Sequence, residues 1–560
     1  MKILKGIAAA QGLVFGKMIY FEKNFDNGAN EIGIDEAAEK ALEKVRYLHK
    51  KTLDTLGAEK AKIFSAYEML LSDKMLITPI KTAIENGEDA KSAVESVTKT
   101  MSDKLSSSKN EYMRQRAEDI IYIGSLLCDV ISGAEDGFDF PDDGEKYIVA
   151  AKELTPVDTM MFDKDRIAGF ITEKGGATSH VVILAKSLGI PAVVGADGIA
   201  EIKEFNGEEA YLDGYGGRLI ITPDEGASAE YARKLDDERK FAQELEKIKK
   251  NGAQTEDGER ISVCVNIGKP SDLKGYEEEK LDGVGLFRSE FLYSSKSVKP
   301  SFDEQVKAYR EAIEKASPDA VTIRTLDIGG DKRLDYLDMK DEENPFLGNR
   351  GIRLCLKNEE IFAEQLKAIL VAARGYTAKI MLPMITSISE IKKARAVLDK
   401  VKKELDGENS EYADKILVGI MIETPASAIM ADSFAKHSDF FSVGTNDLVQ
   451  YITASDRGNA DVEELYNPYH PAVINMLSNV IKAGEKHGIE VSVCGDLASN
   501  TEFTKLLLGL GLKKFSVPLP VAGRIKHKIS HTDGTSARAL AKRVLGAEDE
   551  SEIKNIISRG

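Results

Sequence analysis

Long hydrophobic runs, clustered cysteines and a surplus of positive charge are all missing from this 560-residue sequence. No apolar stretch reaches the roughly 18 residues that a membrane-spanning helix needs, so we predict no insertion into a membrane. The first residues, Met1 to Gly6, lack the long apolar core of a signal peptide, and export is not expected. The sequence therefore predicts a cytoplasmic protein.

Cysteine is scarce, and its few positions are far apart. No CxxC pair occurs, which argues against a disulfide framework and against a zinc site built from paired cysteines. The acidic residues outnumber the basic ones by 93 to 76, giving a formal net charge of −17. This charge disfavours nucleic acid or an anionic membrane as the main partner, and it is compatible with a basic protein partner. The four cysteines are Cys128, Cys264, Cys355 and Cys494.

Histidine is also rare, and one histidine stands apart from the rest. His180 is the only histidine between residues 50 and 436, and it follows a polar turn that starts with two glycines at 175–176. Thr178 or Ser179 can cap a helix there, which would place His180 in the first turn. The positive end of the helix dipole would stabilise an anion on its imidazole and favour the neutral, nucleophilic ring. We interpret the other six as ordinary surface or core residues: His49, His437, His470, His487, His527 and His531.

The length suggests about three or four domains, and the composition and hydrophobic pattern change along the chain. Between about 35 and 132, apolar residues recur at helical spacing and Pro79 is the only proline, which predicts a helical bundle. Short apolar runs and glycine turns from 147 to 222 predict a compact α/β domain. The charged stretch 225–251 predicts a long linking helix.

Eight short apolar runs divide the second half of the chain, and most are separated by helical patterns. This alternation predicts a parallel sheet closed into a (β/α)₈ barrel. The runs are 261–267, 283–288, 321–328, 379–385, 416–422, 440–444, 490–494 and 514–517.

Polar residues follow several of these runs at the point where each strand is expected to end. The carboxyl ends of barrel strands meet at one rim, where active sites form. Glu423 and Asp447 offer the hard oxygen ligands that Mg²⁺ prefers. Arginine forks suit phosphate and carboxylate groups, and the thiol of Cys494 could donate a proton to an enolate. Together they indicate phosphoryl transfer. The arginines are Arg288, Arg324 and Arg457.

Several long segments resemble Enzyme I, the PEP–protein phosphotransferase family of the bacterial sugar phosphotransferase system. The segment that ends at His180 is similar to the phosphohistidine signature of enzymes that use phosphoenolpyruvate (PEP). The other matching segments are 283–292, 327–332, 342–353, 421–426 and 441–451. They occur in the order that the family shows and cover most of residues 1–540.

The resemblance implies a multidomain α/β fold with a helical bundle inserted in a swivelling domain and a C-terminal TIM barrel. The expected domains are a phosphohistidine domain (1–25 and 145–225), a helical carrier-binding subdomain (26–144), a linker helix (226–256), a PEP-binding and dimerisation barrel (257–545) and a tail (546–560).

It also implies roles for the residues singled out above. PEP would be held by Arg288, Arg324, Asn446, Asp447 and Arg457. Glu423 and Asp447 would bind Mg²⁺, Cys494 would protonate enolpyruvate, and His180 would carry the phosphoryl group. The acceptor would be the histidine-containing phosphocarrier protein HPr, and the enzyme would be a homodimer.

The sequence departs from the family pattern at Ala177, Val181 and Tyr67, and at Asp496, Ser499 and Asn500 after Cys494. These departures leave open a non-catalytic regulator that binds PEP. A relative of PEP synthase or pyruvate phosphate dikinase is a further alternative. However, the first 140 residues are short and helical for an ATP-binding domain, and no GxxxxGKS loop occurs.

Overall fold

The computed structural model describes residues 1–22, 32–56, 58–106, 111–133, 140–176, 179–294, 298–330, 334, 336–337, 339–459 and 461–560. Two compact units make up this part of the chain, Met1–Arg239 and Lys240–Gly560. The boundary falls inside helix α8 (Glu225–Lys249), a highly charged helix in which only Tyr231 is buried. No helix among the described residues is long and apolar enough to cross a bilayer.

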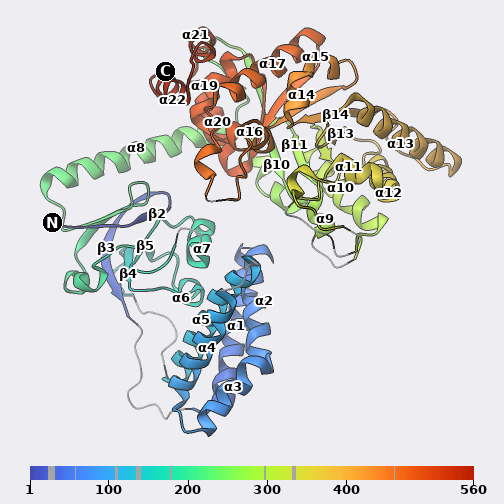
Figure 1. Ribbon diagram of the computed structural model, residues 1–560. Coiled ribbons are helices and arrows are strands. Elements are labelled where there is room, and N and C mark those ends of the chain that lie inside the picture. Colours follow the sequence, from blue (N-terminus) through green and yellow to red (C-terminus); the bar gives the residue numbers. More distant parts are fainter. Residues whose placement is uncertain are drawn as a thin grey trace. The chain divides into compact units, whose positions relative to one another are not determined.

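An eight-stranded mixed sheet forms the first part of the N-terminal unit (Figure 1). Its order is β1-β8-β7-β3-β4-β5-β6-β2, and β3 to β6 run parallel. Ile148 and Val149 belong to hydrophobic clusters on opposite faces, as the two-residue period of a strand requires. Its strands are β1 (Lys2–Lys5), β2 (Ile7–Ala10), β3 (Leu13–Phe21), β4 (Tyr147–Ala151), β5 (Ile167–Thr172), β6 (Ala192–Val194), β7 (Glu209–Asp213) and β8 (Arg218–Ile221).

Among the described residues between β3 and β4, five helices form the predicted bundle. Ala37, Ala41, Val45 and Leu48 are fully buried because their spacing places them on one face of α1. Tyr67 also lies in this core, where its ring packs edge-on against Phe64. The helices are α1 (Ile34–Leu56), α2 (Ala58–Ser72), α3 (Lys74–Glu85), α4 (Ala90–Ser106) and α5 (Glu111–Ile131), followed after β4 by α6 (Pro156–Met161) and α7 (His180–Leu188).

The second unit contains a closed parallel barrel, and all eight predicted strands are confirmed. The barrel closes because the first strand, β10, pairs with both β17 and β11. Asn266 and Ser516 reinforce this seam, since the Asn266 amide donates a hydrogen bond of 2.9 Å to the Ser516 carbonyl. The strands are β10 (Arg260–Ile267), β11 (Val284–Arg288), β12 (Val321–Arg324), β13 (Ala378–Leu382), β14 (Leu417–Ile422), β15 (Phe440–Gly444), β16 (Glu490–Cys494) and β17 (Lys514–Pro518); β9 (Ala253–Gln254) precedes them.

Helices follow the barrel strands, and the last of them lies in the segment that was expected to be a tail. Residues 546–560 contain α22, which starts at the N-cap Asp549 and buries Ile553 and Ile557 in the barrel core. The helices are α9 (Glu290–Ser294), α10 (Phe302–Ala316), α11 (Ile352–Lys357), α12 (Glu359–Ala372), α13 (Ile388–Gly407), α14 (Pro425–Ile429), α15 (Ala431–Phe434), α16 (Thr445–Thr453), α17 (Pro471–His487), α18 (Asp496–Ser499), α19 (Thr501–Gly509), α20 (Leu519–Ser530), α21 (Gly534–Leu545) and α22 (Glu550–Ser558).

Candidate active site

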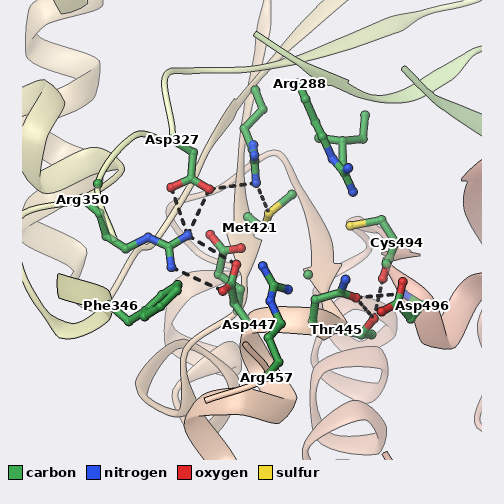
Figure 2. A pocket seen from close by; sticks show the side chains of 17 residues that line it. Arg288, Asp327, Phe346, Arg350, Met421, Thr445, Asp447, Arg457, Cys494 and Asp496 are labelled. Carbon is green, nitrogen blue, oxygen red and sulfur yellow. Dashed lines mark hydrogen bonds and ion pairs between the residues drawn. The ribbon is translucent and has the colours of Figure 1, made fainter. Parts of the chain in front are cut away.

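A cavity of about 300 Å³ opens at the carboxyl ends of the barrel strands (Figure 2). Four of the strands (β11, β12, β14 and β16) place a polar residue where the apolar run stops, either as the last residue of the strand or directly after it. All seven site residues that the sequence places in the barrel line this one cavity. They are Arg288, Arg324, Glu423, Asn446, Asp447, Arg457 and Cys494.

The three predicted arginines differ in how their charge is balanced. Arg324 is buried and lies 2.8 Å from Glu290 and 3.0 Å from Asp327. Burial disfavours its charge, but these carboxylates together outweigh that cost and raise the pKa of Arg324. Arg288 and Arg457 are exposed at the cavity, and neither forms an ion pair within the described part of the chain. Arg288 and Arg457 therefore supply the positive charge available to an anionic ligand.

Arg350 also lines the cavity and was not among the predicted site residues. One of its amino groups lies 3.2 Å from Asp327, and the other lies 3.3 Å from Asp447 and 3.2 Å from the Tyr451 hydroxyl. Arg324, Asp327, Arg350 and Asp447 thus alternate in charge along one wall. Because Arg350 lies inside one of the segments that resemble Enzyme I, that resemblance was the signal that could have found it.

Glu423 is almost completely buried beside a second carboxylate. Its Oε1 accepts a hydrogen bond of 2.6 Å from the backbone N–H of Met384. Burial, followed by the nearby charges of Asp447 and Asp327, raises the pKa of Glu423 to about 8. A Cβ at Gly444 would lie 2.8 Å from the Glu423 carboxylate, so only glycine leaves room for it. Glu423 and Asp447 thus offer two neighbouring carboxylates, a donor set suited to a divalent cation.

Cys494 ends β16 with its thiol directed toward Arg288 (Figure 2). The thiol is buried, and it donates a hydrogen bond of 3.3 Å to the Val443 carbonyl. Burial raises the pKa of the Cys494 thiol, although Ser442 and Arg288 act in the opposite direction. The thiol therefore stays protonated at neutral pH, as a proton donor must.

Comparison with known proteins covers nearly the whole chain. Three family models match in order: the N-terminal domain of PEP-utilising enzymes at 5–116, their mobile domain at 143–217 and their PEP-binding domain at 242–533. The phosphoenolpyruvate-protein phosphotransferases of Staphylococcus carnosus and Bacillus subtilis are each 38% identical to it, over 99% of this chain and 98% of theirs. The chain belongs to the phosphoenolpyruvate-protein phosphotransferase (Enzyme I) family.

The predicted family and enzyme class are thereby confirmed. A solved structure titled as an Enzyme I NMR solution structure is 31% identical, with a TM-score of 0.34, and covers 42% of this chain and 99% of its own. The match to Enzyme I relatives runs along the whole chain. We therefore favour this family over the PEP synthase alternative.

His180 lies in the segment that matches the mobile domain of the family. It is the first residue of α7, as the glycine-rich turn predicted, and Ser179 occupies the N-cap position without a capping hydrogen bond from its side chain. The side chain of His180, together with Ala177 and Thr178, lies outside the described residues. Val181 is buried in the core of the sheet domain, which gives this departure from the Enzyme I pattern a packing role.

The departures after Cys494 also have structural roles. Asp496 lines the cavity, and its backbone N–H donates a hydrogen bond of 2.8 Å to Asn446. Gly495 has a φ of +86°, and a Cβ there would lie 2.4 Å from Asn446. The Ser499 hydroxyl donates a hydrogen bond to the carbonyl of Gly495, and the Asn500 side chain caps the N-terminus of α19. These residues therefore hold the turn after Cys494 in place.

Proposed function

We propose that this enzyme takes the phosphoryl group of PEP onto His180 and passes it to the phosphocarrier protein HPr. This is the first step of PEP-dependent sugar uptake, and it would take place in the cytoplasm. One observation carries the proposal: two arginines without an ion pair among the described residues, a carboxylate pair and a protonated thiol converge on one cavity. We also propose the domain boundaries expected from the sequence, with α22 in place of the tail.

The cavity would hold PEP by its phosphate and carboxylate groups. The guanidinium groups of Arg288 and Arg457 are free to bind the phosphate, because carboxylates do not neutralise them in the described structure. The charge of buried Arg324 is already balanced by carboxylates. We therefore propose that Arg324 keeps the cavity wall in place and positions the nearest end of PEP. Asn446 would contribute its amide N–H groups, since its oxygen is occupied by Asp496.

Glu423 and Asp447 would hold Mg²⁺, the hard divalent cation that oxygen ligands favour. The raised pKa of Glu423 supports this assignment, because a cation beside its carboxylate would stabilise the charged form that burial disfavours. When bound, the ion would neutralise charge on the oxygens of the phosphoryl group. Arg350 contacts Asp447 in the described structure, and so it would hold that carboxylate in place for the ion.

Phosphoryl transfer breaks the bond between the phosphorus and the enol oxygen of PEP and forms one between phosphorus and an imidazole nitrogen of His180. The product that leaves is the enolate of pyruvate. The thiol of Cys494 would give its proton to the terminal carbon of this enolate, which yields pyruvate, and the thiolate would regain a proton from water. The N-terminus of α7 would stabilise the phosphate carried by His180.

We expect substitution of Glu423 by glutamine to weaken divalent-metal binding. The change removes one anionic ligand while keeping size and hydrogen-bond capacity. Mn²⁺ binding, followed by electron paramagnetic resonance, should weaken by at least about tenfold, in line with the loss of a metal-site partner. Glu404→Gln on the exposed face of α13 is the matched control and should bind Mn²⁺ like the wild type. Equal Mn²⁺ affinity in the two variants would remove Glu423 from the metal site.

HPr would dock on the helical bundle. Met69 on α2 and Met75 on α3 flank the junction of these helices with about 69% and 73% of their surface exposed. Exposed flexible methionines are typical of protein-binding surfaces, and the acidic chain suits a basic carrier. Homodimerisation through the barrel would use another surface, where Ile429 and Met430 are adjacent and exposed.

The test of the proposed function is transfer of ³²P from labelled PEP, with Mg²⁺, first to the enzyme and then to added HPr. Met69→Glu should slow transfer to HPr by about tenfold, the size expected when an interface anchor is lost. It should leave labelling of the enzyme itself unchanged. Leu417→Glu alters an exposed apolar residue of the barrel instead of the bundle. It should change neither labelling of the enzyme nor transfer to HPr. An enzyme that binds PEP but never becomes labelled would be the non-catalytic regulator.

A further inference from the structure

Two histidines and a glutamate gather where the end of α8 packs against α20, outside the active-site cavity. Glu244 comes from α8, His527 from α20, and His531 is the C-cap residue of α20. One possible ligand atom from each of the three lies within 4.8 Å of the other two. We propose that Glu244, His527 and His531 form a binding site for a divalent transition-metal ion, with Zn²⁺ as the best match. From the sequence alone, both histidines are expected to be ordinary surface or core residues.

The two histidines are spaced for joint metal binding. They are four residues apart, so they project from the same side of the helix end, and their ring centroids are 4.1 Å apart with 26° between the planes. The Nδ1–H of His531 donates a hydrogen bond of 2.9 Å to the carbonyl of His527. This bond leaves the lone pair on Nε2, and histidines that bind metals usually anchor their other nitrogen in this way.

Glu244 reaches the pair from the neighbouring helix. Its Oε2 lies 3.1 Å from the Nε2 of His527, and Phe241, one turn earlier in α8, packs edge-on against the same ring at 4.9 Å. Lys526 also holds the end of α8, because its ammonium group donates hydrogen bonds of 2.8 Å and 3.0 Å to the carbonyls of Lys249 and Lys280. Local packing therefore holds the carboxylate beside the imidazoles.

The donor set favours zinc over the magnesium proposed for the barrel. Two imidazole nitrogens and one carboxylate oxygen suit Zn²⁺, which would complete a tetrahedron with water, whereas Mg²⁺ prefers oxygen ligands. Tetrahedral Zn²⁺ places its ligand atoms roughly 3.4 Å apart, given bonds of about 2.0–2.1 Å. His531 is exposed, so a small rotation of its side chain could close the remaining gap. A bound ion would tie the part of α8 that follows Arg239 to the barrel.

The test compares Zn²⁺ binding by the full-length protein with that of matched variants. Each protein is stripped with a chelator, saturated with Mg²⁺ and titrated with Zn²⁺ by calorimetry. We expect His531→Gln and His527→Gln to bind Zn²⁺ at least about tenfold more weakly than the wild type at this site. His487→Gln is the control, because His487 forms a similar pair with Asp432 at 3.0 Å, and it should bind as the wild type does.

A second measurement reports on the ligands directly. Co²⁺ added in place of Zn²⁺ should give the strong visible absorption of a tetrahedral site in the wild type and in His487→Gln, and lose it in His531→Gln. Circular dichroism without metal confirms that the variants are folded, which is expected because His531 is exposed. The proposal is overturned if the wild type binds no more Zn²⁺ than His531→Gln does, or if all four proteins bind Zn²⁺ equally.

Discussion

An enzyme in which His180 is replaced by alanine should no longer become labelled by PEP. The imidazole is the proposed nucleophile, and loss of a nucleophile typically lowers a rate by more than about 10³-fold. The measurement is incorporation of ³²P from labelled PEP, supported by the phosphate mass shift of the intact protein. Both signals should fall to background.

A measurement of PEP binding distinguishes loss of the nucleophile from unfolding of the variant. The cavity belongs to the unit Lys240–Gly560, whereas His180 belongs to Met1–Arg239, so calorimetry should show wild-type PEP affinity in His180→Ala. His487→Gln removes a histidine of the barrel unit and should keep full labelling. Labelling that persists in His180→Ala would place the phosphoryl group on another residue and overturn the proposed function.

Substitution of Cys494 by alanine should give the second-largest effect, a slowing of turnover with PEP affinity retained. A proton donor acts only after the enolate has formed, and loss of general acid catalysis typically costs about 10²–10⁴-fold in rate. Single-turnover labelling of the enzyme should continue, while pyruvate formation slows. Exchange of label between pyruvate and PEP should slow in the same proportion, because the reverse reaction needs the same group as a base.

The pH dependence gives an independent check on Cys494. Burial raises the pKa of this thiol above its ordinary value of 9.0, so the donor form persists at pH 7 and pH 8. Pyruvate formation by the wild type should therefore not decline across this range through loss of the thiol proton. Cys128→Ala, which alters a cysteine buried in the helical bundle, should leave turnover unchanged. Fast turnover by Cys494→Ala would assign the proton to another donor.

The barrel site was largely predictable from sequence because of one geometric rule. Parallel strands bring their carboxyl ends to one rim, so a polar residue directly after an apolar run can be placed without knowing the rest of the fold. Arg288, Arg324 and Cys494 each end a strand, and Glu423 follows one at once. The helical spacing of Leu42, Val45 and Leu48 identified the bundle by an equally local pattern.

Arg350 shows what such local patterns cannot provide. Its carboxylate partners Asp327 and Asp447 are 23 and 97 residues away, and a loop carries it between them. No periodicity specifies where a loop arginine will lie, since that depends on how the loop folds over the rim. Glu244 and His527 are 283 residues apart, and they meet only because α8 packs on α20.

The seam of the barrel has a consequence for how the enzyme is made. The first strand, β10, cannot complete its pairing until β17 has been synthesised. The Asn266–Ser516 contact shows that β17 lies about 250 residues later in the chain. Until the ribosome has released that segment, the nascent sheet has two open edges that can pair with other chains. We therefore expect a chain that stops before Lys514 to aggregate, whereas an isolated segment 1–239 could fold while synthesis continues.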